Sequence, residues 1–232
     1  MKNKINDCKT IEELILLWQS KYPNKVFVKD GIVNPDKWVT QEIKPMFLLK
    51  EAYGGKESWD LTNDHILVKS KKQVDKTWKK VTQWTYGIMN TTPTSSPFFD
   101  ENAIPKEFAN EYLQSIAIVN VKKIAGGSTS VWAELEEAVD NDKDFLKKEI
   151  ELIEPTVIVC GYTMSFLEKI LGAKIKKTSN KNLYYFTEIN GKKVIILDYY
   201  HPGNQYPDIM NYYALTNIYQ LALQDLNGGE EK

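Results

Sequence analysis

Short apolar segments alternate along this chain with longer segments in which apolar residues recur at helical spacing. Three of the apolar segments are typical of buried strands, and they cover residues 46–49, 115–121 and 156–160. The segments with helical spacing are 11–20, 72–87, 106–113, 142–153, 164–171 and 207–226. Strands that alternate with helices form a mostly parallel sheet with helices on both faces. The sequence therefore predicts an α/β fold with three layers, α/β/α, around a short and mostly parallel central sheet.

Local signals mark several ends of these segments. Thr10 precedes the first helical segment and Glu13 follows three residues later, which is the pattern of a capping box. Asn190-Gly191 separates two apolar segments and predicts a tight β-hairpin. There is no internal repeat, so we expect a single domain over residues 1–226 and a polar tail over residues 227–232.

The composition limits the kinds of partner and site that are expected. The 232 residues carry a net charge of −1, so any basic surface for nucleic acid must be local. Cys8 and Cys160 are the only cysteines and fit no metal-ligand spacing, so we expect no metal and no cofactor. No apolar run approaches the roughly 18 residues that span a bilayer, and the N-terminus lacks a signal-peptide pattern. We expect a cytoplasmic monomer that does not associate with membranes.

Polar residues lie at the ends of three apolar runs. Glu51 follows the run at 46–49, Asn120 lies within the run at 115–121, and His201 follows another apolar run. Ligands of parallel sheets bind beyond the carboxyl ends of the strands. A carboxylate there can position or deprotonate a water molecule, and an amide suits the edge of a pyrimidine. An imidazole can donate a hydrogen bond to an oxygen on which negative charge develops.

Each of these residues also has a structural interpretation that requires no ligand. Glu51 would then be a surface carboxylate before a loop, and Asn120 would cap the end of a strand. His201 would be a histidine at the edge of the core that is bonded to the backbone. The other histidine, His65, lies in a polar stretch and is expected at the surface.

Two kinds of segment could hold phosphate groups. Gly126-Gly127-Ser128 follows the second strand and could bind a phosphate through backbone N–H groups. Lysines that neutralise phosphates would give salt-dependent binding, although the same lysines could form a solvated helix face. The lysine-rich stretches are 69–80, with Lys69, Lys71, Lys72, Lys76, Lys79 and Lys80, and 174–181.

The ordered set of segments resembles the uracil-DNA glycosylase superfamily. Residues 49–54 read Leu-Lys-Glu-Ala-Tyr-Gly and resemble the first motif of the branch that carries Gly-Glu-Ala-Pro-Gly. They also resemble the Gly-Gln-Asp-Pro-Tyr motif of the main branch. Asn120 matches the strand-end asparagine of the family, and residues 201–203, His-Pro-Gly, resemble its His-Pro-Ser motif. These short matches are scattered in order over residues 43–225.

The resemblance implies a DNA glycosylase that hydrolyses the N-glycosidic bond of uracil or another damaged base in DNA. It places Glu51 at the position that activates water, and His201 where the anion of the departing base is stabilised. Tyr53 falls where a tyrosine limits the base pocket. The implied substrate-binding residues are Asn120, Ala52, Tyr53 and Gly54, and the implied phosphate contacts are Gly126, Gly127, Ser128, Gly203 and Asn204.

The chain departs from the family pattern at several points. Lys50 replaces a Gly or Gln, and the last motif lacks the Ser-Pro-Leu type of wedge. Two cysteines cannot supply the four ligands of the family's iron–sulfur members, and Trp59 is only a candidate for the aromatic residue that stacks on the base. The same fold could instead bind nucleic acid without cleavage or act on a free nucleoside or modified base. In a third interpretation the domain is an unrelated doubly wound fold, in which Glu51, Asn120 and His201 do not converge.

Overall fold

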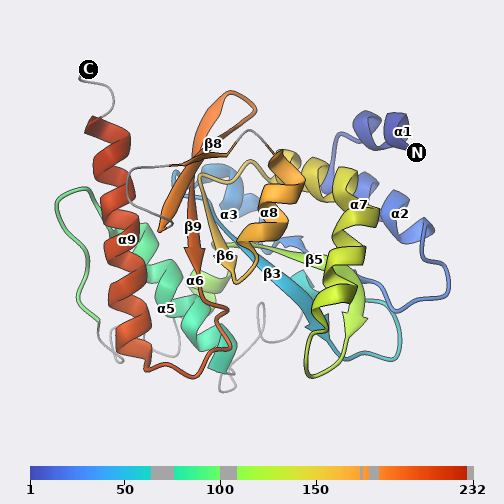
Figure 1. Ribbon diagram of the computed structural model, residues 1–232, viewed down its shortest axis with the longest axis horizontal. Coiled ribbons are helices and arrows are strands. Elements are labelled where there is room, and N and C mark those ends of the chain that lie inside the picture. The colour runs from blue at the N-terminus through green and yellow to red at the C-terminus, as the bar shows by residue number, and fades with distance from the viewer. Residues whose placement is uncertain (64–75, 100–108, 173–174, 178–182, 229–232) are drawn as a thin grey trace.

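A seven-stranded sheet forms the centre of the molecule, with the strand order β2-β5-β3-β6-β9-β8-β7. Figure 1 shows the computed structural model, which describes residues 1–63, 76–99, 109–172, 175–177 and 183–228. In sheet order the strands are Gly31–Ile32, Ala117–Gly126, Pro45–Tyr53, Val157–Gly161, Lys192–Tyr199, Tyr184–Ile189 and Lys176–Lys177. The central strands β5, β3, β6 and β9 are parallel, whereas β2, β8 and β7 pair in antiparallel fashion at the two sides. The predicted α/β fold is confirmed, and the sheet is parallel only at its centre.

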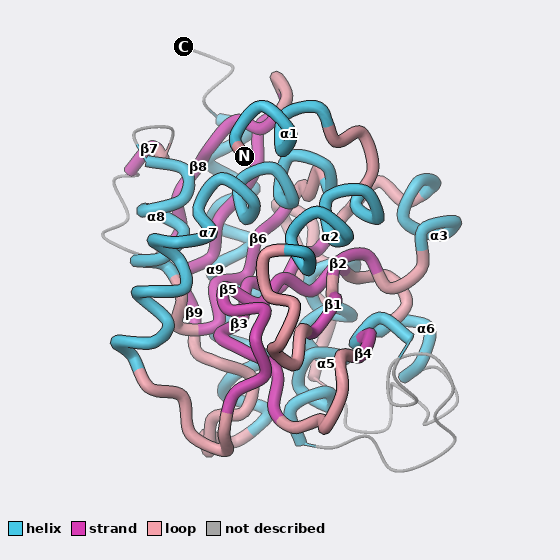
Figure 2. The backbone as a smooth tube through the Cα atoms, turned by 90° about the vertical axis from the view of Figure 1, so that its right-hand side faces the viewer, coloured by secondary structure: helices cyan, strands magenta, loops and turns pink. Residues whose placement is uncertain are grey.

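Helices cover both faces of this sheet and form the outer layers (Figures 1 and 2). One face carries α1 (Lys2–Asp7), α2 (Ile11–Ser20), α7 (Trp132–Ile153) and α8 (Met164–Leu171), and the other carries α5 (Lys76–Asn90), α6 (Ala109–Leu113) and α9 (Asp208–Gly228). Successive strand residues point to opposite faces, so Leu48 packs with the first set while Phe47 and Leu49 pack with the second. None of the helices in the described ranges combines the length and the apolar character needed to cross a membrane.

The structure also contains small elements that the sequence patterns did not predict. Helix α3 (Pro35–Thr40) begins after Asn34, whose side chain accepts a hydrogen bond from the Lys37 backbone N–H at 3.1 Å. Strands β1 (Val28–Lys29) and β4 (Trp59–Asp60) pair separately from the main sheet. A 3₁₀ turn, η1, follows at Leu61–Asn63. These elements are too short for a periodic pattern to reveal them.

Several local predictions are confirmed. Thr10 and Glu13 form both hydrogen bonds of the capping box at the start of α2. Asn190 and Gly191 adopt positive φ angles of 50° and 78° between β8 and β9, as a tight hairpin turn requires.

Two helices are longer than predicted. Helix α7 begins at Trp132 rather than at residue 142, and α9 continues to Gly228. The predicted helix residues 72–75 and 106–108 lie outside the described residues.

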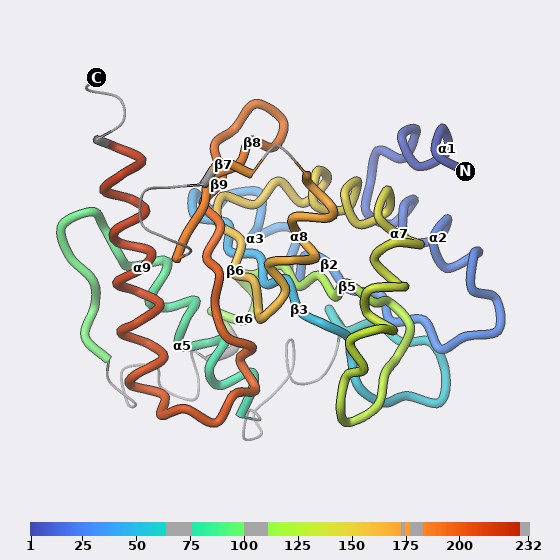
Figure 3. Tube along the Cα trace, in the orientation of Figure 1, coloured from blue at the N-terminus to red at the C-terminus, as the bar shows by residue number. Residues whose placement is uncertain are grey.

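The carboxyl ends of the four parallel strands share one edge of the sheet, which we call the carboxyl edge. Figure 3 traces the chain from β3 to β5 on one side of β3, and then to β6 and β9 on the other. The strand order therefore changes direction around β3 and β6. In open α/β sheets, ligands bind at such a switch point, beyond the carboxyl ends of the strands.

Candidate active site

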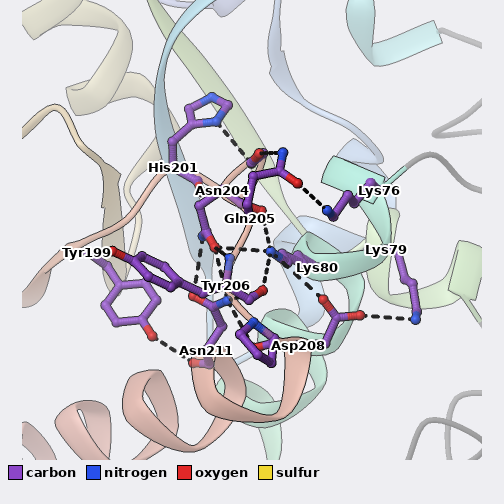
Figure 4. Close-up of polar contacts among 12 residues, drawn as sticks. Lys76, Lys79, Lys80, Tyr199, His201, Asn204, Gln205, Tyr206, Asp208 and Asn211 are labelled. Carbon is purple, nitrogen blue, oxygen red and sulfur yellow. Dashed lines mark hydrogen bonds and ion pairs between the residues drawn. The ribbon is translucent and has the colours of Figure 1, made fainter.

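His201 lies in the loop that follows β9 at the carboxyl edge, shown in Figure 4. The backbone N–H of Gly203 donates to His201 Nδ1 at 3.0 Å, so this nitrogen is unprotonated. Burial and, to a smaller extent, the charge of Lys50 together lower the pKa of His201 to about 4. The imidazole is therefore neutral near pH 7, and its one ring hydrogen is on Nε2.

A buried lysine holds the loop of residues 200–207, which we call the His201 loop. Lys80 Nζ donates to the carbonyl oxygen of Asn204 at 2.6 Å, to Asn204 Oδ1 at 3.1 Å and to the carbonyl oxygen of Tyr206 at 3.1 Å. Its side chain is fully buried, and burial lowers the pKa of Lys80 while Asp208 opposes that shift. Lys80 is thus a structural cation inside the loop rather than a surface lysine.

The N-terminal part of α9 completes this support (Figure 4). Asn211 Nδ2 donates to Asn204 Oδ1 at 3.1 Å and to the carbonyl oxygen of Tyr206 at 3.1 Å. The hydroxyl of Tyr199 donates to the carbonyl oxygen of Asn211 at 2.8 Å. The backbone N–H of Asn204 and its Nδ2 both donate to the carbonyl oxygen of His201, at 3.0 and 2.8 Å. The donors of Gly203 and Asn204, which were predicted to contact phosphate, are therefore used within the loop.

The other described lysines of the first lysine-rich stretch also contact this region. Lys76 Nζ donates to Gln205 Oε1 at 2.6 Å, and Lys79 lies 3.0 Å from Asp208. Lys69, Lys71, Lys72 and His65 lie outside the described residues, as do Lys174 and residues 178–181 of the second stretch.

Glu51 is a buried carboxylate on β3, not a surface residue before a loop. Its Oε2 lies 2.7 Å from Lys122 Nζ on the neighbouring strand β5, and Lys122 also contacts Glu134 at 2.6 Å. Burial lowers the pKa of Lys122, but the hydrogen bonds to Glu134 and Glu51 outweigh it and raise the pKa overall. A Cβ atom on Gly126 would overlap the Glu51 carboxylate, so this glycine provides the space that the carboxylate fills.

Asn120 is buried on β5, and its amide is held by a second carboxylate. The backbone N–H and Nδ2 of Asn120 both donate to Asp30 Oδ2, at 2.8 and 2.9 Å. Asp30 Oδ1 forms an ion pair with Lys123 Nζ, which lies 2.8 Å from Glu149 Oε2, and these three side chains are fully buried. One amide hydrogen of Asn120 is thus taken, and no described residue forms a hydrogen bond with its Oδ1.

Sequence reasoning did not assign two further residues to this edge, Tyr162 and Lys50. Tyr162 follows β6 with a left-handed φ of 62°, and its N–H donates to the carbonyl oxygens of Cys160 and Tyr199, both at 2.8 Å. Lys50 Nζ lies 5.2 Å from the centre of the Tyr162 ring. The position of Tyr162, directly after the glycine that ends an apolar strand, was the sequence signal that could have identified it.

The strand register shows how far the predicted residues converge. Leu49 pairs with Asn120 and Glu51 with Lys122, so the Cα atoms of Glu51 and Asn120 lie about 8 Å apart. Strands β5 and β9 would be about 14 Å apart by strand spacing alone. The His201 loop turns back over β6, since a Cβ on Gly161 would lie 3.5 Å from Pro202 Cδ. Glu51, Asn120 and His201 thus share the carboxyl edge.

The remaining predicted residues occupy different surroundings. Ala52 is buried in the core on the α5 side, whereas Tyr53 is exposed at the end of β3. Gly54 turns the chain with a φ of 88°, and Trp59 Nε1 donates to its carbonyl oxygen at 3.4 Å. Gly127 and Ser128 are exposed after β5. Trp59 therefore supports the turn after β3, and this contact gives it no role in stacking on a base.

Within the described ranges, no three His, Cys, Asp or Glu side chains gather as ligands for a metal ion. No protein-family model matches the chain, and a search of curated proteins finds no match.

Proposed function

We propose that this protein is a DNA glycosylase that hydrolyses the N-glycosidic bond of uracil or another damaged base. The observation that carries the proposal is the state of His201. Its Nδ1 accepts a hydrogen bond from Gly203, and its lowered pKa keeps the ring neutral, so Nε2–H is a fixed donor at the carboxyl edge. Glu51 lies on β3 and Asn120 on the neighbouring strand β5, near the same edge of the sheet.

The departing base would leave with the two electrons of the glycosidic bond and carry negative charge on a ring carbonyl oxygen. A neutral imidazole stabilises that charge by a hydrogen bond without giving up its proton. Lys50, whose charge acts on His201, adds a favourable positive potential. The base anion then takes a proton from solvent.

The other two residues would act on the water and on the base. Glu51 would accept a hydrogen bond from a water whose oxygen bonds to the sugar carbon, and would take the water proton. Asn120 would read the amide edge of the base with its Oδ1 and its remaining N–H. Asp30 would fix the orientation of that amide, because it holds the other hydrogen.

A second candidate function is binding of nucleic acid, or of a nucleoside or modified base, without cleavage. It is favoured by the ion pair of Glu51 with Lys122, since this carboxylate already has a partner. It is also favoured by the internal use of the Gly203 and Asn204 donors.

The test is single-turnover base release from oligonucleotides that carry uracil, hypoxanthine or xanthine, in single- and double-stranded form. We expect Glu51→Gln and His201→Ala each to slow release at least about 100-fold. Glu57→Gln, which removes an exposed carboxylate in the turn after β3, should leave release unchanged. Absence of release from every substrate, or release that survives both substitutions, would exclude the glycosylase and favour the binding function.

A further inference from the structure

Exposed aromatic side chains gather at the carboxyl edge. They lie at or after the ends of the four neighbouring parallel strands, one or two per strand, and are between 40% and 71% exposed. They are Tyr53 at the end of β3, Trp132 after β5, Tyr162 after β6, and Tyr200 and Tyr206 after β9. Single exposed apolar side chains are common on protein surfaces, whereas a group of them marks a site of interaction. The grouping of these aromatic residues at one edge therefore indicates a binding surface.

Trp132 and Tyr162 form the first of two ring pairs at this edge, and the pair is rigidly supported. Trp132 stacks on the buried ring of Phe166, with centroids 4.6 Å apart and an interplanar angle of 26°. Tyr162 meets the same indole edge-on, at 6.0 Å and 71°. Phe166 covers one face of the indole, so the exposed area of Trp132 belongs to its edges and its other face.

The second pair lies within the His201 loop. The rings of Tyr200 and Tyr206 are 5.2 Å apart, and Tyr200 also contacts Tyr199 at 5.4 Å. Lys80 holds the carbonyl oxygen of Tyr206 from inside the loop. Both ring pairs are therefore fixed before any ligand binds, which lowers the entropy that binding must overcome.

The backbone at Tyr162 gives an independent sign of function. Its φ of 62° is a conformation that glycine or asparagine adopts most readily and that a tyrosine rarely adopts. An exposed side chain kept in such a conformation, at a switch point of the sheet, is typical of a binding site. Lys50, whose Nζ lies over the Tyr162 ring, supplies a cation next to that site.

We infer that the carboxyl edge binds single-stranded nucleic acid, with bases stacked on the Trp132–Tyr162 pair and on the Tyr200–Tyr206 pair. This inference depends on the proposed function in one respect: the target nucleotide would lie between the two ring pairs, at His201. Stacking needs unpaired bases, and aromatic rings bind bases of any sequence. A duplex would instead rely on phosphate contacts, but Lys76, Lys79 and Lys80 contact the protein itself.

Fluorescence anisotropy with labelled oligonucleotides that contain only normal bases tests the inference. The probes are one single-stranded DNA, the RNA of the same sequence and the corresponding DNA duplex. We expect a single strand to bind more tightly than the duplex, and the tighter of the DNA and RNA probes identifies the preferred sugar. Tyr162→Gly and Tyr200→Ala should each weaken single-strand binding about ten-fold.

Two controls separate the possible failures. Phe98→Ala removes an aromatic side chain that is 84% exposed in the segment packed on α9, and it should leave binding unchanged. Tyr162→Gly relieves the left-handed backbone, so its thermal stability should not fall and lost binding cannot be ascribed to misfolding. Tighter duplex binding, or single-strand binding that neither tyrosine substitution alters, overturns the inference. Single-strand binding that depends on both tyrosines, together with no base release from the oligonucleotides that carry uracil, hypoxanthine or xanthine, overturns only the proposed catalysis.

Discussion

The buried cluster of Asp30, Lys123 and Glu149 predicts an unusual dependence of stability on pH. The cluster contains two carboxyl groups and one ammonium group, all without exposed area. Burial raises the pKa of Glu149 to about 8; Lys123 opposes this shift and the charge of Asp30 adds to it. We therefore expect Glu149 to hold a proton at pH 7 in the folded protein, and the substitution Glu149→Gln to mimic that neutral state.

The sign and size follow from proton linkage. Unfolding would return the pKa of Glu149 from about 8 to its ordinary value of 4.5. Between these values the folded state binds more protons, so the free energy of unfolding falls as pH rises, by up to about 1.4 kcal/mol per pH unit. From pH 5 to pH 8 the wild type should therefore lose about 3.5 kcal/mol relative to Glu149→Gln. For a chain of this size that corresponds to between about 7 and 14 °C in Tm.

The assay is thermal or urea unfolding of both proteins at half-unit steps from pH 5 to pH 8. The informative quantity is the difference between the two curves, because the contributions of titratable groups that both proteins share cancel in it. One such group is His201: its lowered pKa makes the free energy of unfolding rise with pH between about 4 and 6.5, opposite to the effect of Glu149. Glu137→Gln, an exposed position on the same helix, should show no pH-dependent difference from wild type. Parallel curves for wild type and Glu149→Gln would refute the reasoning and show that Glu149 is ionised beside Lys123.

Two further substitutions test the contacts around the site. Gly126→Ala should displace the Glu51 carboxylate and slow base release at least about ten-fold, as expected from the role proposed for Glu51. Gly127→Ala, where a Cβ would make only an ordinary van der Waals contact with the Thr129 carbonyl oxygen at 3.9 Å, should release base at the wild-type rate. Lys80→Met should lower the free energy of unfolding by about 3 kcal/mol in urea titrations, because it leaves buried acceptors of the His201 loop unpaired. Lys79→Met removes a partly exposed ion pair with Asp208 and should cost less than about 1 kcal/mol. Equal losses from the two lysine substitutions would contradict the structural role of Lys80.

Periodic patterns and local signals were sufficient for the layered α/β fold and for the positions of the central strands. The capping box at Thr10 and the turn at Asn190-Gly191 depend on residues that are close together in the sequence, so both could be predicted from a few neighbouring residues. The carboxyl ends of the strands are equally predictable. Parallel strands run in the same direction, so the residues that follow each apolar run lie at the same edge of the sheet. Glu51, Asn120 and His201 could therefore be placed at one edge without a structure.

The partners of these residues could not be predicted, because the contacts are distant in sequence. Asp30 is 90 residues from Asn120, and Lys80 is 124 residues from Asn204. A lysine in a lysine-rich helix has the pattern of a solvated residue, and nothing in that pattern distinguishes Lys80 from its exposed neighbour Lys79. Burial of a charge depends on which distant oxygens surround it, and only the folded chain shows them.

The His201 loop takes its final shape late in translation, because its supports come from segments far apart in the chain. The loop is held from α5 by Lys80 and from the first turn of α9 by Asn211. The strands and helices before residue 200 are made first and can begin to pack as the ribosome releases them. The loop reaches its final shape only after the C-terminal helix has been synthesised and has docked. A nascent chain that still lacks α9 therefore has its central strands but no organised His201 loop.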